Sequence, residues 1–280
     1  MTIKISVLVD NNTLIDSYFC GEPGVCYHIE ADGHKILFDT GYSDIFIDNA
    51  HTLGIDLATI TDLALSHGHN DHTWGLNHLI QYYDRRNCYF PQKIRLIYHP
   101  DALLPKQFDT KVIGANIPKD VLKAYFDNYE TDKPFYLSDN VIFLGQIPRN
   151  NTFEGKEPIG TTINADHQTI DDYVWDDSAL AIKTTEGLII VTGCSHSGIC
   201  NIVEYAKQVT KIDKIVTVIG GFHLQEASDE VLNQTGHYFS QLNVDQIHPC
   251  HCTDLAAKIH LSKFAAIKEV GVGLVLTYPS

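Results

Sequence analysis

One short segment of the sequence, SHGHNDHTWG, carries four side chains that can bind a metal ion: His67, His69, Asp71 and His72. Alternate residues of an extended loop project to the same side, so His67 and His69 can reach one ion. Asp71 and His72, at the start of the following helix, can reach a second. The alternative is an ordinary loop in which Asp71 caps a helix and each histidine is a surface or core residue. Four ligand-type residues within six positions favour the metal site.

Two ligands for each ion are too few, because zinc in proteins takes four ligands, and a catalytic zinc keeps one position for water. The other ligands must come from distant parts of the chain. The apolar run LALS precedes the cluster and TWGLNHLIQYY follows it. We expect a strand and a helix there, which places the cluster in a loop at the carboxyl end of a strand, where functional sites are common.

Ten apolar, β-branched segments bounded by Gly, Asp, Asn or Pro predict strands. They are IKISVLV, VCYHI, KILFDT, LALS, IRLIYH, VIFLG, ALAIKT, LIIVT, IVTVIGG and LVLT. The dipeptide Asp32-Gly33 predicts a hairpin turn, and Glu186-Gly187 a weaker one.

Helices are predicted between the strands from apolar residues at helical spacing. One buried face consists of Leu76, Leu79, Ile80 and Tyr83, and another of Ile199, Ile202, Val203 and Ala206. A last helix is predicted to start at Thr253 or Asp254, either of which can cap it. Its expected inward residues are Leu255, Ile259, Ala266 and Val270.

The length of 280 residues and the apolar fraction of 44% suit one large globular domain spanning 1–280. Residues 85–175 are richer in Pro, Asn and Asp and less periodic, which predicts a loop-rich insertion. Each half has hairpin strands, then a strand that ends in a histidine-containing segment, then an amphipathic helix. We therefore expect an α/β fold in which two similar halves form a four-layer αββα sandwich.

The composition also limits the binding partners and the cellular location that can be expected. The net charge of −15 repels phosphate backbones, so nucleic-acid binding is not expected. No segment has the ~20 consecutive apolar residues of a membrane span, and the charged start MTIKISVLVDNN does not fit a secretory signal. Seven cysteines without a regular framework indicate free thiols in a reducing compartment. The predicted location is the cytoplasm, and the oligomeric state is left open.

The motif HxHxDH, preceded by FDTG, resembles the metallo-β-lactamase superfamily of metal-dependent hydrolases. The segments IPRNNTFE, VTGCSHSGICNI, VIGGFHL and HPCHCT are similar to those of one subgroup. That subgroup includes 7,8-dihydropterin-6-methyl-4-(β-D-ribofuranosyl)-aminobenzene-5'-phosphate synthase. The resemblance implies the metallo-β-lactamase type of sandwich.

The resemblance also implies distant ligands. His196 in GCSH would complete the site of His67 and His69, and His251 in PCHCT would join Asp71 and His72. Many superfamily members have TGD where this chain has TGC, so Cys194 stands where a bridging aspartate is expected. A thiolate suits zinc. The alternative for Cys194 is a small buried residue with a packing role.

Other residues are expected beside the metals. Asp39 would hold a ligand histidine or a loop amide in place, or cap a strand end. His223, after a Gly-Gly pair, would contact substrate or transfer a proton, or else be a hydrogen-bonded core histidine. Arg149 would clamp a phosphate or carboxylate, or else be an ordinary surface arginine. Alternation along an extended chain predicts that Cys250 and Cys252 point away from the ligand between them and pack.

The predicted activity is a metal-dependent hydrolase that uses a metal-bound hydroxide at a mono- or dinuclear site, with Asp71 as ligand and catalytic residue. Zinc is expected because the second position of the motif is an imidazole, and manganese and iron are the alternatives. The substrate is expected to be a small ester or phosphorylated molecule. Two other functions stay open. One is a transferase that joins a pterin methyl pyrophosphate to an aminobenzene ribotide phosphate, and the other is a non-catalytic metal-binding protein.

Overall fold

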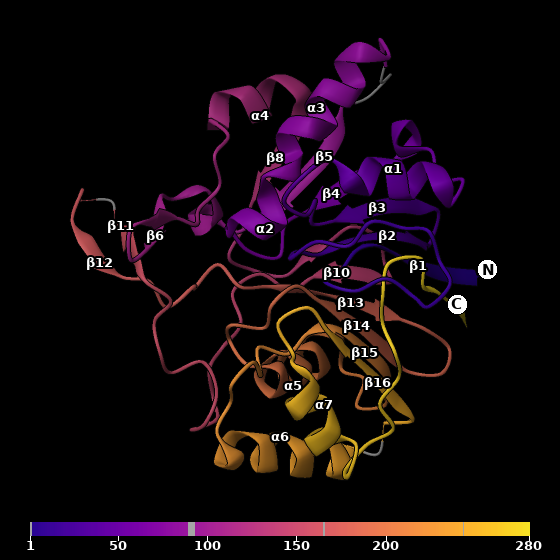
Figure 1. The fold of residues 1–280 in the computed structure, drawn as a ribbon, viewed down its shortest axis with the longest axis vertical. Helices are drawn as coiled ribbons and strands as arrows, with labels where there is room; N and C mark the ends of the chain where they lie inside the picture. The colour runs from indigo at the N-terminus through magenta and orange to yellow at the C-terminus, as the bar shows by residue number, and fades with distance from the viewer. Residues whose placement is uncertain (1, 89–92, 165, 243) are drawn as a thin grey trace.

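Two large β-sheets lie face to face at the centre of the protein, and helices cover the outer face of each sheet (Figure 1). The structure, a computed structural model, describes residues 2–88, 93–164, 166–242 and 244–280. The layers follow the order helices, sheet, sheet, helices. This order confirms the four-layer αββα sandwich predicted from the sequence.

The first sheet has seven strands, six from the N-terminal half and one from the C-terminus. In order across the sheet they are β17 (Val275–Pro279), β1 (Thr2–Val9), β2 (Cys26–Ala31), β3 (His34–Phe38), β4 (Asp62–Ala64), β5 (Ile94–Tyr98) and β8 (Phe126–Glu130). Strands β17 to β3 pair antiparallel, and β3 to β8 pair parallel. The hairpin between β2 and β3 turns at Asp32 and Gly33, whose φ angles of 53° and 82° suit the predicted turn.

The second sheet has six strands. In order they are β16 (Gln246–Cys250), β15 (Ile215–Gly221), β14 (Leu188–Thr192), β13 (Ala179–Lys183), β10 (Val141–Phe143) and β9 (Phe135–Tyr136). In β14, Ile189 and Val191 pack between the sheets, whereas Leu188 and Ile190 pack under the helices. Successive side chains of a strand point to opposite faces, so a strand covered on both faces is apolar throughout.

The helices form the two outer layers (Figure 1). Those of the N-terminal half are α1 (Ile45–Thr52), α2 (Asn70–Thr73), α3 (Gly75–Arg85) and α4 (Lys119–Tyr125), and those of the C-terminal half are α5 (Ile199–Thr210), α6 (Asp229–Leu242) and α7 (Leu255–Leu261). Two short 3-10 helices span Leu57–Thr59 and Pro100–Leu103. The predicted faces of α3 and α5 are buried, and α6 was not predicted. Among the described residues, no helix is long and apolar enough to cross a bilayer.

The last helix begins where the sequence predicts, because the Asp254 side chain accepts a hydrogen bond from the amide of Ala257 at 2.7 Å. The predicted inward face is wrong. Leu255 and Ile259 are 72% and 58% exposed, and the buried residues are Ala257 and Leu261. The helix ends at Leu261, so the expected contacts of residues 266 and 270 cannot belong to its face.

The segment 85–175, predicted as a loop-rich insertion, contributes β5, β8, β9 and β10 to the two large sheets. Part of the remainder forms a third sheet in the order β12 (Thr169–Asp171), β11 (Thr161–Ile163), β6 (Lys106–Phe108) and β7 (Lys111–Val112). This small sheet lies beside the end of the sandwich that carries α2 (Figure 1). The insertion is therefore narrower than the sequence suggested, and it borders the loop of the histidine motif.

Candidate metal centre

The candidate ligands follow the carboxyl ends of strands in both large sheets. His67, His69, Asp71 and His72 lie in the connection from β4 to α3, Cys194 and His196 lie between β14 and α5, and His251 follows β16. Asp39 directly follows β3. Ligands in open α/β sheets commonly bind outside the carboxyl ends of the strands. Here the stacking of the two sheets joins two such ends into one site.

His67, His69 and His196 form the first group. Their ligand nitrogens all lie within 4.8 Å of one another, and all three side chains are buried. Nε2 of His67 and Nδ1 of His69 are 3.0 Å apart. Nε2 of His69 and both ring nitrogens of His196 have no hydrogen-bond partner in the part of the chain that the structure describes. A buried polar atom without a partner is costly, so these nitrogens fit a bound cation.

Asp71, His72 and His251 form the second group, whose ligand atoms also lie within 4.8 Å of one another. The Oδ2 atom of Asp71 is 3.4 Å from Nε2 of His251 and 3.8 Å from Nε2 of His72. The Asp71 side chain is 26% exposed, in contrast to the fully buried His72. The carboxylate is therefore the solvent-facing member of this group.

Cys194 lies between the two groups. Its Sγ atom is 3.2 Å from Nε2 of His72 and 3.1 Å from Nε2 of His251. It also forms a possible metal-binding triplet with His67 and His72. The thiol thus faces ligand nitrogens from both groups, the place expected of a bridging side chain. The donor set of imidazoles, one carboxylate and a thiol matches the preferences of zinc.

Asp39 fixes the orientation of His72. Its Oδ2 atom is 2.6 Å from Nδ1 of His72 and accepts a hydrogen bond from the Ser66 hydroxyl at 2.6 Å, while its Oδ1 accepts one from the Ser66 amide at 2.7 Å. With Nδ1 engaged, Nε2 of His72 is left to face the centre. Gly193 permits this packing, because a Cβ there would lie 2.1 Å from the Ser66 hydroxyl oxygen.

Electrostatics differ between the two groups. Burial lowers the pKa of His67 and His196 well below the ordinary value, and lowers the pKa of His69 to about 4. These imidazoles are neutral at pH 7, the form that binds metals. Burial also acts to lower the pKa of His72, but the Asp71 and Asp39 carboxylates outweigh it and raise that pKa to about 9. The two carboxylates thus stabilise a positive charge at His72, and a metal ion bound to its ring would take the place of that proton.

Comparison with known proteins shows the family of the chain. Residues 21–138 match the model of the metallo-beta-lactamase superfamily. An uncharacterized protein of Methanocaldococcus jannaschii is 34% identical over 97% of this chain and 99% of its own length. The 7,8-dihydropterin-6-methyl-4-(beta-D-ribofuranosyl)-aminobenzene-5'-phosphate synthase of the same organism is 31% identical over 91% of this chain and 89% of its own. The chain belongs to the metallo-β-lactamase superfamily.

Solved structures of metallo-β-lactamase proteins superpose on the whole chain. Tm1679, a metal-dependent hydrolase of the beta-lactamase superfamily, has a TM-score of 0.83 and 29% identity, covering 99% of this chain and 100% of its own. The metallo-beta-lactamase fold protein YhfI from Bacillus subtilis has a TM-score of 0.59 and 12% identity, with coverage of 99% and 100%. The second likeness concerns the fold alone.

A cavity of about 340 Å³ opens beside the first group. His196 and His223 line it, with their ring centroids 4.3 Å apart. Its other walls are mainly apolar and include Phe153, Tyr173 and Phe222. His223 is exposed and has a φ of 51°, so the turn after β15 presents its ring at the cavity. The predicted substrate contact of His223 stays a prediction, and its ring lines the cavity beside the first group.

Arg149, which is predicted to clamp an anion, contacts mainly backbone. Its guanidinium donates to the carbonyl oxygens of Gly155, at 2.7 Å, of Tyr173, and of Val174, at 3.1 Å. It also stacks over the Trp175 ring, 4.4 Å from the centroid. Three of its five N–H groups therefore bind backbone carbonyls of loops that border the cavity, whereas the Nε–H group has no partner among the described residues, so the anion clamp stays a prediction.

The prediction that both cysteines around His251 point away from the centre holds for one of them. Cys250 is buried, and its Sγ is 3.2 Å from the Tyr27 hydroxyl. Cys252 instead groups with Cys194 and His251, with ligand atoms within 4.8 Å of one another. The reason is that His251 has a φ of 51°, so the chain leaves the extended conformation and alternation fails after it.

Sequence reasoning missed a buried charge cluster behind the histidine motif. The ammonium of Lys106 lies 2.9 Å from a carboxylate oxygen of Asp172 and 2.8 Å from one of Asp176. The other oxygen of Asp176 accepts a hydrogen bond from the amide of Gly68 at 2.7 Å. Gly68 lies between His67 and His69, so this cluster holds the motif in place. No local pattern signals it, because its members are far apart in the sequence.

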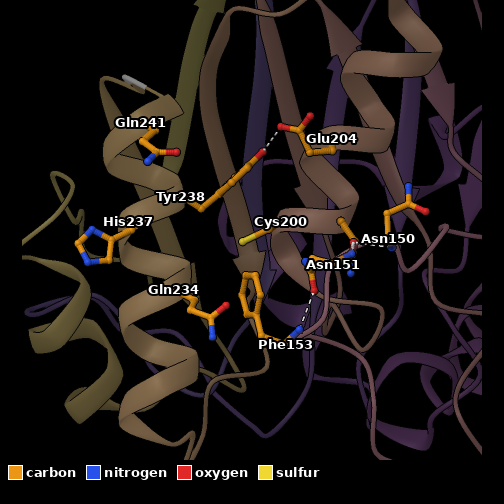
Figure 2. Close-up of a pocket in the computed structure, with 10 residues that line it drawn as sticks. Asn150, Asn151, Phe153, Cys200, Glu204, Gln234, His237, Tyr238 and Gln241 are labelled. Atoms are coloured by element: carbon orange, nitrogen blue, oxygen red, sulfur yellow. Dashed lines mark hydrogen bonds between the residues drawn. The ribbon is translucent and has the colours of Figure 1, made fainter.

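A second cavity, of about 460 Å³, lies between α5 and α6 (Figure 2). Polar side chains line it, and the Tyr238 hydroxyl donates to a carboxylate oxygen of Glu204 at 2.7 Å across it. None of the first or second group lines this cavity. His196 lines the cavity that it shares with His223, and His251 lines a further cavity of about 760 Å³, so the ligand groups border both of these spaces.

Proposed function

We propose that the protein is a metal-dependent hydrolase whose centre takes one or two zinc ions. The observation that carries the proposal is the approach of the first and second groups to one thiol, that of Cys194. It is combined with buried ring nitrogens of His69 and His196 that have no hydrogen-bond partner among the described residues. Membership of a superfamily that contains metal-dependent hydrolases supports it. Imidazole and thiol donors favour zinc, with manganese and iron as the alternatives to test.

Bound metal ions lower the pKa of a water molecule and polarise a carbonyl or phosphoryl oxygen. The side chains of this protein have complementary tasks. The exposed edge of the Asp71 carboxylate orients the attacking water and accepts its proton. Asp39 keeps His72 turned toward the centre through its 2.6 Å contact. His223 contacts the substrate in the neighbouring cavity.

The substrate that we propose is a small ester or phosphorylated molecule. The cavity beside His223 has a volume of about 340 Å³, near the low end of the roughly 300–1,000 Å³ typical of small-molecule sites. The net charge of −15 disfavours a nucleic acid as partner. We also propose a cytoplasmic location, since all seven cysteines are free in the structure.

A transferase is the second candidate, and one observation favours it. The relative named as a dihydropterin ribofuranosylaminobenzene phosphate synthase is 31% identical over 91% of this chain. The two activities separate in a single assay with a pterin pyrophosphate. A hydrolase releases products in the absence of an acceptor, whereas a transferase turns over only when the aminobenzene ribotide phosphate is present.

The test begins with metal content. Elemental analysis of protein reconstituted with excess zinc should find one or two ions per chain, and a zinc-free protein would contradict the proposal. His196→Ala should weaken the ion of the first group, and His251→Ala that of the second. If both replacements leave the metal content unchanged, the ligand assignment is wrong.

Turnover is then screened over phosphodiesters, lactones and pterin pyrophosphates. Asp71→Asn should lower kcat at least about 100-fold, the low end of general-base contributions, with little effect on substrate binding. His223→Ala is the matched comparison, because it should alter KM and leave the metal content unchanged. Full turnover by Asp71→Asn with metal bound would show that the centre is not catalytic in this way, and would favour a metal-binding protein without activity.

A further inference from the structure

Apart from Cys194, Cys252 is the only member of the metal-binding triplets in the described chain that belongs to neither group. Its Sγ atom lies within 4.8 Å of the Cys194 Sγ and of a ring nitrogen of His251. The thiol donates to the carbonyl oxygen of Cys194 at 3.4 Å and accepts from the amide of His223 at 3.3 Å. It is therefore enclosed by three loops of the centre and does not pack in an apolar core.

Two backbone features on neighbouring strands bring this thiol to the centre. The φ of 51° at His251 turns the chain after β16, so Cys252 does not alternate away from its neighbour. Gly221, at the end of β15, leaves the space, because a Cβ there would lie 2.6 Å from the Cys252 Sγ. Any other residue at that position would exclude the thiol from its place. The local structure is shaped around the sulfur atom.

We propose that Cys252 is a second thiol donor of the metal centre, beside Cys194, on the side of the second group. The inference rests on the proposed metal-dependent function and adds a ligand to it. With two sulfur donors the site prefers thiophilic divalent ions, zinc or cobalt, to manganese or magnesium. On binding, the Cys252 thiol loses its proton to solvent and gives up its hydrogen bond to the Cys194 carbonyl oxygen.

The remaining hydrogen bond gives the sulfur a second task. The amide of His223 still donates to the Cys252 Sγ. A hydrogen bond to a thiolate is stronger than a hydrogen bond to a thiol. A bound ion therefore tightens the turn that carries His223. In this way, metal binding at the second group is coupled to the position of His223 in the wall of the substrate cavity.

Cobalt(II) titration of the full-length, reduced protein tests the proposal, because sulfur bound to cobalt gives a charge-transfer absorption in the near ultraviolet. Wild type should show the band, and Cys252→Ala and Cys194→Ala should each lose about half of its intensity, since each removes one of two thiolates. Cys252→Ala should also weaken zinc binding by about tenfold or more. Cys20→Ala is the matched control, because Cys20 is exposed and should leave band and affinity unchanged.

A second measurement needs no variant and so does not depend on folding of the mutants. Wild type is alkylated with iodoacetamide with and without zinc, and the modified cysteines are identified by mass spectrometry. Zinc should protect Cys194 and Cys252 and leave Cys20 reactive. Cobalt binding with a full band in Cys252→Ala, or equal labelling of Cys252 with and without zinc, would overturn this proposal alone. Failure of wild type to bind either metal would overturn the proposed function as well.

Discussion

Replacement of Lys106 tests whether the buried charge cluster holds the histidine motif. The ammonium is almost fully enclosed, with a side-chain exposure of 1%, and lies within 2.9 Å of the carboxylates of both Asp172 and Asp176. Lys106→Met keeps an unbranched side chain, shorter by the terminal nitrogen, and leaves two buried carboxylates without their cation. Breaking a buried ion pair by removing one partner costs about 3–5 kcal/mol. That is a large share of the roughly 5–15 kcal/mol that stabilises a typical domain.

The assay is urea unfolding of both proteins at several pH values. The carboxylates left by Lys106→Met will have folded-state pKa values above their unfolded values, so their cost is present at neutral pH and disappears as the pH falls and they protonate. We expect a deficit in unfolding free energy of about 3–5 kcal/mol at pH 7 that shrinks toward pH 4. Lys111→Met on the same small sheet is the control, because Lys111 is exposed and should change stability by less than about 0.5 kcal/mol.

The same variant has a consequence for the metal centre. Asp176 accepts the amide hydrogen of Gly68 at 2.7 Å, and without Lys106 that carboxylate is free to protonate or shift. Zinc affinity should fall about tenfold, measured by competition with a chromophoric chelator. A deficit below about 1 kcal/mol at pH 7, or one that does not change with pH, would refute the reasoning about the charge cluster.

Three further predictions follow from single residues. Burial lowers the pKa of His28 from 6.5 to about 4. The contribution of the neutral ring to the free energy of unfolding is therefore present above pH 6.5 and is lost as the pH falls through 4. Wild type should lose about 2 kcal/mol more unfolding free energy between pH 7 and pH 4.5 than His28→Leu, and parallel losses would contradict this. Gly68→Ala should lose zinc on elemental analysis, because a Cβ would lie 1.9 Å from the carbonyl oxygen of Ala102, and normal metal content would show that the loop can shift. Glu154→Ala leaves the Cys200 amide at the start of α5 without its 3.1 Å acceptor and should cost about 1–2 kcal/mol in urea unfolding, with an unchanged midpoint as the contrary result.

Much of the sandwich could be predicted from the sequence because its signals are local. The ten apolar segments correspond to strands of the two large sheets, since β-branched runs between turn residues have few other stable conformations. The turn at Asp32 and Gly33 and the buried faces of α3 and α5 depend on residues within one turn or one helix of each other. The small third sheet was missed, because its strands are two or three residues long and carry no periodicity.

Part of the candidate centre could also be predicted from neighbouring residues in the sequence. His67, His69, Asp71 and His72 lie on one connection, so their proximity required only that the connection follow a strand. The approach of His196 and His251 came from the resemblance to the metallo-β-lactamase superfamily, since no spacing rule joins segments that far apart. The surroundings of Arg149 could not be predicted for the same reason. Nothing near it in the sequence shows that backbone carbonyls of residues 155, 173 and 174 accept hydrogen bonds from three of its donors.

The sequence by itself therefore determined the layers, the motif and the kind of atoms that the centre offers. The tertiary structure alone decided which of those atoms meet. It placed Cys252 beside Cys194 through a single left-handed residue, His251, and it put Lys106 behind Gly68. The physical reason is that these contacts depend on the packing of two sheets and on one backbone angle. Neither can be predicted from the types of residues that are neighbours in the sequence.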